Sequence, residues 1–555
     1  MSGLAWPRGL VRWRRGARRS EDASLEAGRR TAGVEQAAAS AVKPSTGAPA
    51  EPGAPAPAMR GSALPSTTSV TAAPRAPTAA VSAAAAAMPL GSASTAGPST
   101  TARPATAATT ASARTSAPAA TPTRILIVAE HASARFGGEA VLALHYFRVL
   151  RRRGLDAWLV VHERTREELE RLFPDAGERI RYVPDTPAHI ALWRLGQRLP
   201  DRLSAFTTGY AMRLLTQRAQ LREVRALVAE HGIEVVHQPM PVSPKEPSLL
   251  RAVGAPVVIG PMNGGMTYPP GFADRQGRLT RWVIEAGRAG ADLANRLAPG
   301  KPEAALLLVA NERTRRALPL GLGARARLLV ENGVDLSLWQ PRPAHAAPRT
   351  GSAPPVRFTF VGRLVDLKAV DCLIDAFVQA RGHAPMSLSV IGDGEQRAAL
   401  EAQARRHDAL AGAPGEAGRV HFAGWMTQAE CAARLREADA LVLPSLHECG
   451  GAVVLEAMAV GLPVIASAWG GPLDYLDAEC GVLVPVESRE GFVAGLADAL
   501  ARLAGDAALR ERMGEVGRRR VAEEFDWEVK VDRMLGLYAE AMHSFAHPPG
   551  GGAAA

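Results

Sequence analysis

Short continuous runs of apolar residues recur along the chain from residue 124 onward. The first run, ILIVA (125–129), is typical of a strand that is buried on both faces of a parallel sheet. A glycine-containing loop follows it, and the segment 139–154 then has the apolar spacing of an amphipathic helix that ends at Gly154. The next run, AWLVV (157–161), completes a strand–loop–helix–strand unit of Rossmann type.

Similar apolar runs fall into two series along the chain. A long helical segment is expected at 187–230, and further strands of the first series are expected at 233–237, 256–260, 305–310 and 327–330. The second series comprises the runs 356–362, 387–392, 419–424, 440–444, 463–467 and 481–485. Two such series predict an α/β protein with two Rossmann-like domains that face across a cleft. Ligands are expected at the carboxyl ends of the strands.

The domain boundaries follow from these series and from the composition between them. The stretch 341–355 is rich in Pro and small residues and is expected to be the linker. The first domain then covers 124–340 and the second covers 356–525. A last helix at 526–545 is expected to pack back on the first domain.

Residues 1–123 differ in composition from the rest of the chain. They are dominated by Ala, Pro, Ser, Thr and Gly, a composition that buries too little apolar area to offset chain entropy, so we expect a disordered extension. The extension could be a non-functional product of a mis-assigned start, with Met59 and Met88 as later candidates, or a tether that contacts membranes through the Arg cluster at 8–19. It carries 13 Lys and Arg against 5 Asp and Glu, which is most of the net charge of +10. The basic balance therefore does not indicate that the folded part binds nucleic acid.

Localisation signals are few. No apolar run approaches the ~18 residues that span a bilayer, and no apolar stretch of the kind found in signal peptides follows the basic N-terminus. The four cysteines form no C-x-x-C pair. These features fit a cytoplasmic protein. The Arg-rich stretch 187–225 could touch the inner face of a membrane or could be a solvated helix face.

The first candidate site is the segment from Gly362 to Lys368, where a strand ends and a helix begins. Free N–H groups at a helix start favour an anion. Arg363 can hold a phosphate with its planar fork and Lys368 adds a point charge. Read alone, these are also compatible with a surface Arg and Lys in a loop. Gly392 ends the next strand, and its turn, 392–395, is expected to line the same pocket.

The second candidate is a pair of carboxylates, Glu448 and Glu456. Glu448 follows the strand 440–444, and the backbone of Gly450 and Gly451 can then approach a ligand closely. Glu456 falls within the next helix among apolar residues, where a carboxylate needs a partner because desolvation is costly. Vicinal sugar hydroxyls would be a suitable partner. Two unrelated glutamates are the plain alternative.

Four further residues or segments complete the candidate set. Val453 lies on the first turn after the glycines and is assigned with them to donor binding. Gly137 and Gly138 could approach a phosphate or sugar, or form only a tight turn. His237 ends the strand 233–237 and could reach a substrate, or be a satisfied structural histidine. The glycine-rich stretch 260–272 also follows a strand and is expected in the cleft.

Other chemistries lack their motifs. Gly451 stands where the second histidine of an H-E-x-x-H zinc motif would follow His447, and Arg166 does so after His162. No G-x4-G-K-[ST] loop and no D-x-D occurs. We therefore expect no metal ligands and no cofactor beyond a co-substrate.

Taken in order, these segments resemble family 4 glycosyltransferases of the GT-B fold over roughly residues 124–545. The similar pieces are FGGEAVLALHYFRVLRRRG, VHQP, ENGVDLSLWQP, FVGRLVDLKAVDCLIDAF, VIGDGEQRAALE, VHFAGWM and PSLHECGGAVVLEAMAVGLPVIAS. The chain departs from the family where Cys449-Gly450-Gly451 replaces the commoner Gly-Phe-Gly. That departure leaves the sugar specificity open.

The resemblance implies a role for each candidate residue. Arg363 and Lys368 would hold the diphosphate of a nucleoside-diphosphate sugar, Glu456 the ribose and Glu448 the transferred sugar. By the same resemblance, His237 would lie beside the donor sugar or the acceptor, and Gly137 and Gly138 would contact phosphate or acceptor. The implied reaction retains the anomeric configuration, needs no metal and transfers a hexose to a glycan or lipid-linked acceptor in cell-surface polysaccharide assembly. A disaccharide or sugar-phosphate synthase and a non-catalytic nucleotide-binding protein are the alternatives.

Overall fold

The computed structural model describes residues 121–136, 138–199, 204, 207–275, 287, 290–342 and 354–547. The expected disordered extension, apart from residues 121–123, lies outside these residues, as do Gly137 and most of the expected linker. The described residues form two parallel sheets, one of seven strands and one of six. The first sheet ends at Leu328 and the second begins at Val356.

The first sheet has the strand order β3-β2-β1-β4-β5-β6-β7, with every neighbouring pair parallel. Its strands are β1 Arg124–Val128, β2 Asp156–His162, β3 Ile180–Val183, β4 Val235–Gln238, β5 Val257–Met262, β6 Leu306–Val309 and β7 Ala326–Leu328. Six of these match the apolar runs. The strand β3 was not predicted, because Arg181 interrupts its apolar residues.

Helices cover both faces of this sheet. The helices and 3-10 turns are α2 Gly138–Arg152, η1 Glu163–Thr165, α3 Arg166–Leu172, η2 Gly177–Arg179, α4 Pro187–Gly196, α6 Thr208–His231, η3 Pro270–Arg275, α8 Gly300–Glu303, α9 Glu312–Ala317 and η4 Pro319–Arg325. Alternate residues of β1 enter different clusters: Ile125 packs with α2, and Leu126 packs with α6. The helical segment expected at 187–230 is thus divided between α4 and α6.

The second sheet has the order β10-β9-β8-β11-β12-β13 and is also parallel. Its strands are β8 Val356–Val361, β9 Met386–Ile391, β10 Val420–Gly424, β11 Ala440–Leu443, β12 Val464–Ser467 and β13 Gly481–Val484, all at the expected runs. The helices and turns are η5 Asp366–Lys368, α10 Val370–Ala380, α11 Arg397–Arg406, α12 Gln428–Glu437, α13 Ala452–Val460, η6 Gly471–Asp474, α14 Arg489–Gly505, α15 Ala507–Arg520 and the π-turn η7 Val521–Phe525. In both sheets the chain order reverses beside the first strand of the series, β1 or β8, and ligands of such sheets bind at that switch point.

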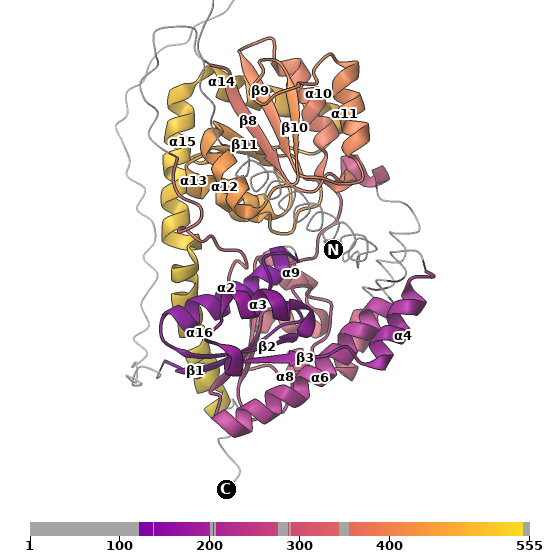
Figure 1. The fold of residues 1–555 in the computed structure, drawn as a ribbon, viewed down its shortest axis with the longest axis vertical. Helices are drawn as coiled ribbons and strands as arrows, with labels where there is room; N and C mark the ends of the chain where they lie inside the picture. Colours follow the sequence, from indigo (N-terminus) through magenta and orange to yellow (C-terminus); the bar gives the residue numbers. More distant parts are fainter. Residues whose placement is uncertain are drawn as a thin grey trace, which may run out of the picture. The chain divides into compact units, whose positions relative to one another are not determined.

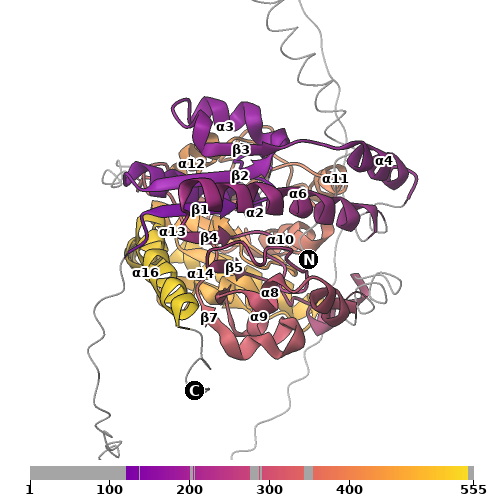
Figure 2. The same cartoon turned by 90° about the horizontal axis from the view of Figure 1, so that it is seen from below.

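The last helix, α16 (Trp527–Ala546), belongs to the core of the first sheet (Figure 1). Its Trp527, Val531 and Tyr538 are buried in the same cluster as residues of β1 and α2. Figure 2 shows α16, drawn in yellow, from a second side. No helix among the described residues has the length and apolarity that crossing a membrane requires.

Candidate active site at the carboxyl ends of the strands

The loop after β8 presents Arg363 to solvent. Gly362 N donates to Ile391 O at 3.0 Å and Leu364 N donates to Asp393 O at 2.9 Å, so the loop is fixed to the end of β9 on either side of Arg363. The Arg363 side chain itself is exposed and has no ion pair or hydrogen bond with any described residue. Its guanidinium is therefore available to an anion.

Gly392 is required by this loop arrangement. It has φ +134°, and a Cβ at this position would lie 1.9 Å from Gly362 O. Only glycine lets the two strand-end loops pack this closely. Donor binding by Gly362 and Gly392 stays a prediction. Their close packing against each other explains why the loop needs glycine at position 392.

Lys368 and Glu448 come together although 80 positions separate them in the sequence. Lys368 ends the 3-10 turn η5, and its Nζ forms a hydrogen-bonded ion pair with Glu448 Oε2. The two side chains are 17% and 15% exposed, so the pair is largely shielded from water. The sequence predicts that the two residues bind separate ligand groups, and in the structure they are in direct contact.

Gly450 and Gly451 connect Glu448 to α13. Gly451 has φ +81° and directly precedes the helix, and a Cβ there would lie 3.0 Å from Glu448 Cγ. Gly450 is pressed against Asn332, whose Nδ2 would be 2.2 Å from a Cβ. Val453 is half-buried on the first turn of α13 and packs against the core. The three residues shape the loop, and their contact with a donor stays a prediction.

Glu456 lies on the second turn of α13 and is half-buried beside the buried residues Leu455 and Ala457. No described residue gives its carboxylate a hydrogen bond or an ion pair. Burial raises the pKa of Glu456 to about 7. A carboxylate that is desolvated and lacks a protein partner fits a group that receives its partner from a ligand.

His237 differs from the expectation that it reaches a substrate. It is fully buried, its Nε2 donates to Gly260 O at 2.6 Å, and its Nδ1 accepts from the Tyr538 hydroxyl at 2.7 Å. Burial lowers the pKa of His237 to about 4, so the ring is neutral. Both nitrogens are used by the protein, and this geometry favours the structural alternative over the catalytic one.

The glycine loop of the first domain is described only in part. Gly137 lies outside the described residues. Gly138 begins α2, is exposed, and a Cβ there would meet nothing within 4 Å. This openness leaves room for a ligand, and contact with phosphate or acceptor stays a prediction.

Sequence reasoning missed a polar network that joins the two domains. Asn263 after β5 contacts Glu331 and the backbone of Cys449, and Asn311 Nδ2 donates to Asp474 Oδ2 at 2.7 Å. Burial raises the pKa of Glu331 to about 7, and a hydrogen bond from Asn263 opposes that shift. The stretch 260–272 follows a strand, and this position indicated that Asn263 lies in the cleft. Nothing in the sequence indicated which residues it contacts.

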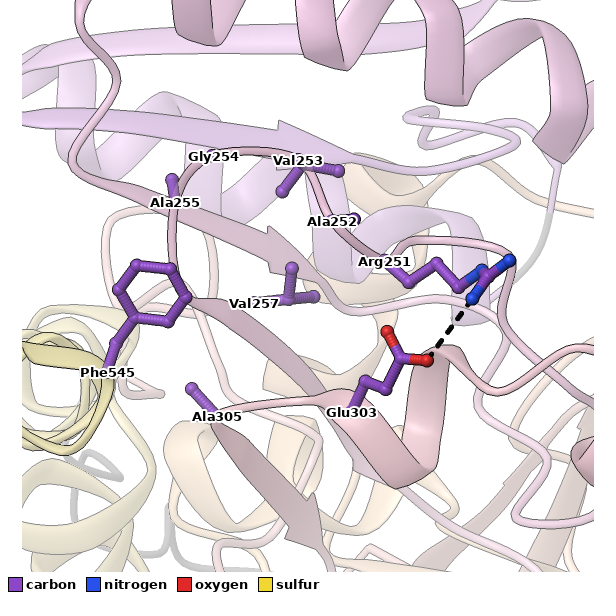
Figure 3. Close-up of a pocket in the computed structure, with 9 residues that line it drawn as sticks. All are labelled: Arg251, Ala252, Val253, Gly254, Ala255, Val257, Glu303, Ala305 and Phe545. Atoms are coloured by element: carbon purple, nitrogen blue, oxygen red, sulfur yellow. Dashed lines mark hydrogen bonds and ion pairs between the residues drawn. The ribbon is translucent and has the colours of Figure 1, made fainter. Parts of the chain in front are cut away.

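A small pocket of about 220 Å³ lies away from these residues (Figure 3). It opens near Val257 and Ala305, at the amino-terminal ends of β5 and β6, and Phe545 of α16 borders it. Arg251 and Glu303 form an ion pair at 3.4 Å on its rim. None of the residues predicted to bind a ligand lines it.

Comparison with known proteins places a family domain over the second sheet. Residues 355–506 match the family described as Glycosyl transferases group 1. That match includes Arg363, Lys368, Glu448 and Glu456.

Two curated relatives show the extent of the sequence similarity. A protein named glycogen synthase from Mycobacterium tuberculosis is 33% identical over 230 residues, which is 41% of this chain and 52% of the relative. The lipopolysaccharide core biosynthesis glycosyltransferase LpsE of Rhizobium meliloti is 35% identical over 180 residues, 32% of this chain and 48% of the relative. The chain thus spans about half the length of the curated relatives it matches.

The fold itself is found in solved structures. The crystal structure of a glycosyltransferase from Rickettsia africae aligns with a TM-score of 0.51 at 12% identity, covering 76% of this chain and 99% of that one. Two parallel-sheet α/β domains in this arrangement are the GT-B fold, and the fold class expected from the sequence is confirmed.

Proposed function

We propose that this chain is a glycosyltransferase that moves a sugar from a nucleoside-diphosphate sugar to a hydroxyl of an acceptor. The observation that carries the proposal is the set Arg363, Lys368, Glu448 and Glu456, gathered around the carboxyl ends of β8 and β11 inside the matched family domain. Two cations and two carboxylates at one switch point suit a diphosphate joined to hydroxyl-rich groups.

The exposed guanidinium and the Lys368 ammonium have a clear task in such a reaction. Negative charge grows on the β-phosphate as the bond to the sugar breaks. Fixed cations at that position stabilise the transition state more than the ground state. Because Arg363 has no partner among the described residues, it is free to take this phosphate.

Binding of the donor would rearrange the ion pair between Lys368 and Glu448. When the diphosphate arrives, Lys368 gains a second anionic partner and its hold on Glu448 weakens. Glu448 then accepts hydrogen bonds from the hydroxyls of the transferred sugar. Glu456, half-buried and without a protein partner, accepts from the ribose hydroxyls.

We further propose the finer assignments that the resemblance implies: family 4, retention of anomeric configuration and transfer of a hexose without a metal. The ground for metal independence is that Arg363 and Lys368 supply the positive charge at the diphosphate. Transfer is therefore expected to continue in excess EDTA. A loss of activity on chelation that Mn²⁺ or Mg²⁺ restores would contradict it.

The acceptor is proposed to be a glycan or a lipid-linked sugar, and the enzyme to work in the cytoplasm, in contact with the inner face of the membrane. The similarity to LpsE supports a cell-surface acceptor. The similarity to a protein named glycogen synthase supports a soluble glucan instead. Product analysis with lipid-extracted and soluble acceptors separates these two.

The decisive experiment is calorimetry of the full chain with UDP-, GDP- and ADP-sugars. We expect one nucleotide class to bind, and the same donor to be consumed when an acceptor extract is added. A folded protein that binds none of the three would overturn the proposal. A protein that binds one of them but does not consume it, with or without any of the acceptors, would support the non-catalytic alternative.

A further inference from the structure

The loop that follows Glu448 is held by side chains of the first domain. Cys449 O accepts a hydrogen bond from Asn263 Nδ2 at 2.9 Å and lies 3.4 Å from a terminal nitrogen of Arg313. Next to it, Gly450 leaves no space for a side chain, because Glu331 Oε1 would lie 2.3 Å from a Cβ. The backbone beyond Glu448 is therefore fixed by residues from the other sheet.

Asn263 is the centre of these contacts. It is 4% exposed, and its Nδ2 also donates to Glu331 Oε1 at 2.7 Å. Its Oδ1 accepts from Arg313 at 3.2 Å and from Thr314 Oγ1 at 3.3 Å. Because a guanidinium only donates, Oδ1 has to face Arg313, and the amide donors have to face Glu331 and Cys449. The amide orientation is thus determined by the network.

The backbone of Glu448 and of the residues before it is held within its own domain. Gly471 N donates to Glu448 O at 2.8 Å, and Leu446 N donates to Leu367 O at 2.9 Å. Asn263 and Arg313 supply side-chain contacts to the carbonyl of Cys449, one residue after Glu448. A change at Asn263 therefore reaches the Glu448 carboxylate through one residue of backbone.

The geometry points to Asn263 as a positioning residue that holds Glu448 in place for the transferred sugar and ties that position to contact between the two domains. This inference rests on the proposed function, in which Glu448 binds the donor sugar. Arg363 and Glu456 lie on other segments that Asn263 does not touch, and Lys368 is reached only through its ion pair with Glu448. We therefore expect nucleotide binding to change little when Asn263 is replaced.

The test is the variant Asn263→Ala in the full chain, assayed for sugar transfer and for binding of the free nucleoside diphosphate. We expect kcat to fall about tenfold, the effect of one hydrogen bond, with the nucleotide Kd within about twofold of the unmodified protein. In a Glu448→Gln background the same substitution should lower kcat by less than about threefold, because residues that act through one another are not additive.

Asn295→Ala is the matched control. Asn295 is also a buried asparagine of the first domain, and its Nδ2 donates to Lys245 O and Ala291 O without reaching the second domain. It should lower stability and leave kcat unchanged. If Asn263→Ala fails to fold, Arg313→Lys takes its place. A few-fold loss of kcat is expected, because an ammonium lacks the planar group that contacts Gly264 O through Nε and both Asn263 and Cys449 through one terminal nitrogen.

The outcomes separate the inference from the proposed function. Transfer by the unmodified protein together with equal kcat for Asn263→Ala and Asn295→Ala would overturn the positioning role alone. A parallel loss of nucleotide affinity would also overturn it, because the contact would then support the whole donor site. An unmodified protein that binds no nucleotide would remove the proposed function and this inference with it.

Discussion

At the scale of single residues, the four charged groups of the proposed donor site have three different environments. Arg363 is exposed and unpaired within the described residues, Lys368 and Glu448 neutralise each other, and Glu456 is half-buried without a partner. An exposed, unpaired guanidinium adds little to the stability of the fold, so we expect the loss of Arg363 to change only the rate of transfer. We expect the loss of the Glu456 charge to change both the kinetics and the stability of the fold.

Arg363→Ala should reduce turnover by ~10²–10³-fold, the range for removal of one group that stabilises charge in a transition state. Thermal stability should be unchanged, because the side chain has no partner to lose. Arg357→Ala is the matched control, since Arg357 lies near the start of the same strand and pairs with Asp439. Equal turnover for the two variants would show that the diphosphate is not bound at Arg363.

Glu456→Gln should stabilise the fold above pH 7 while it raises the donor KM. The pKa of Glu456 is about 7 in the folded protein against an ordinary 4.5, so the folded state binds the proton more tightly. The cost of its charge develops between pH 4.5 and pH 7 and is complete above that range. Glutamine removes this cost. Its gain in Tm should therefore be largest at pH 8 and close to zero at pH 4.

The reference for that measurement is Glu515→Gln, which changes a charge on α15 instead. If Glu456→Gln melts at the same temperature as the unmodified protein at pH 8, the carboxylate is not desolvated as described. If it also binds nucleotide with unchanged affinity, Glu456 does not meet the ribose.

At the scale of elements, strands with a continuous apolar run could be predicted from the sequence, including the edge strands β7, β10 and β13, and the edge strand β3 could not. A strand with both faces covered gives a continuous apolar run such as 440–443, whereas the edge strand β3 (180–183) alternates with half-buried Arg181 and Tyr182. The helix α4 ends at Gly196, and Pro200 follows in the sequence, so residues that commonly stop a helix lie inside the segment predicted as one helix. The apolar pattern of a segment indicates how deeply it is buried. Which strand lies beside it in the sheet depends on residues elsewhere in the chain.

The partner of His237 could not be read from the chain, because Tyr538 lies 301 positions away on α16. Tyr538→Phe should lower the free energy of unfolding by ~1–3 kcal/mol, since it leaves the buried Nδ1 of His237 without a donor. Urea unfolding measures the change. Turnover at a temperature where both proteins are folded should stay within a few-fold.

Tyr182→Phe is the comparison for this variant. The Tyr182 hydroxyl is buried without a hydrogen-bond partner among the described residues, so its removal should cost nothing or stabilise the fold. A loss of turnover of 10² or more in Tyr538→Phe at unchanged stability would return His237 to the catalytic role that the sequence indicated.

At the scale of the whole molecule, the position of the four charged residues at one sheet edge was predictable, and the contact between domains was not. Arg363, Lys368, Glu448 and Glu456 all follow strands of one sheet, and the carboxyl ends of parallel strands meet at one edge. The network of Asn263 with Glu331 and Cys449 instead joins three distant segments. Polar residues at strand ends are common. Only the three-dimensional structure shows which of them contact one another.

Removal of residues 1–120 should leave folding and transfer largely intact, because their composition lacks a core-forming pattern. The truncation should keep Thr123, whose N–H donates to Glu234 Oε2 at 2.7 Å. A second truncation, of residues 1–128, is the matched comparison. It also removes β1, which pairs with both β2 and β4 in the middle of the first sheet, and it should not fold.

Circular dichroism and thermal melting measure the folding of both truncated proteins, and transfer to a soluble acceptor measures their activity. If the shorter deletion unfolds, or folds and loses transfer to a soluble acceptor, the extension is part of the working enzyme. If it loses transfer only to a lipid-linked acceptor, the extension serves the membrane contact that its Arg cluster offers.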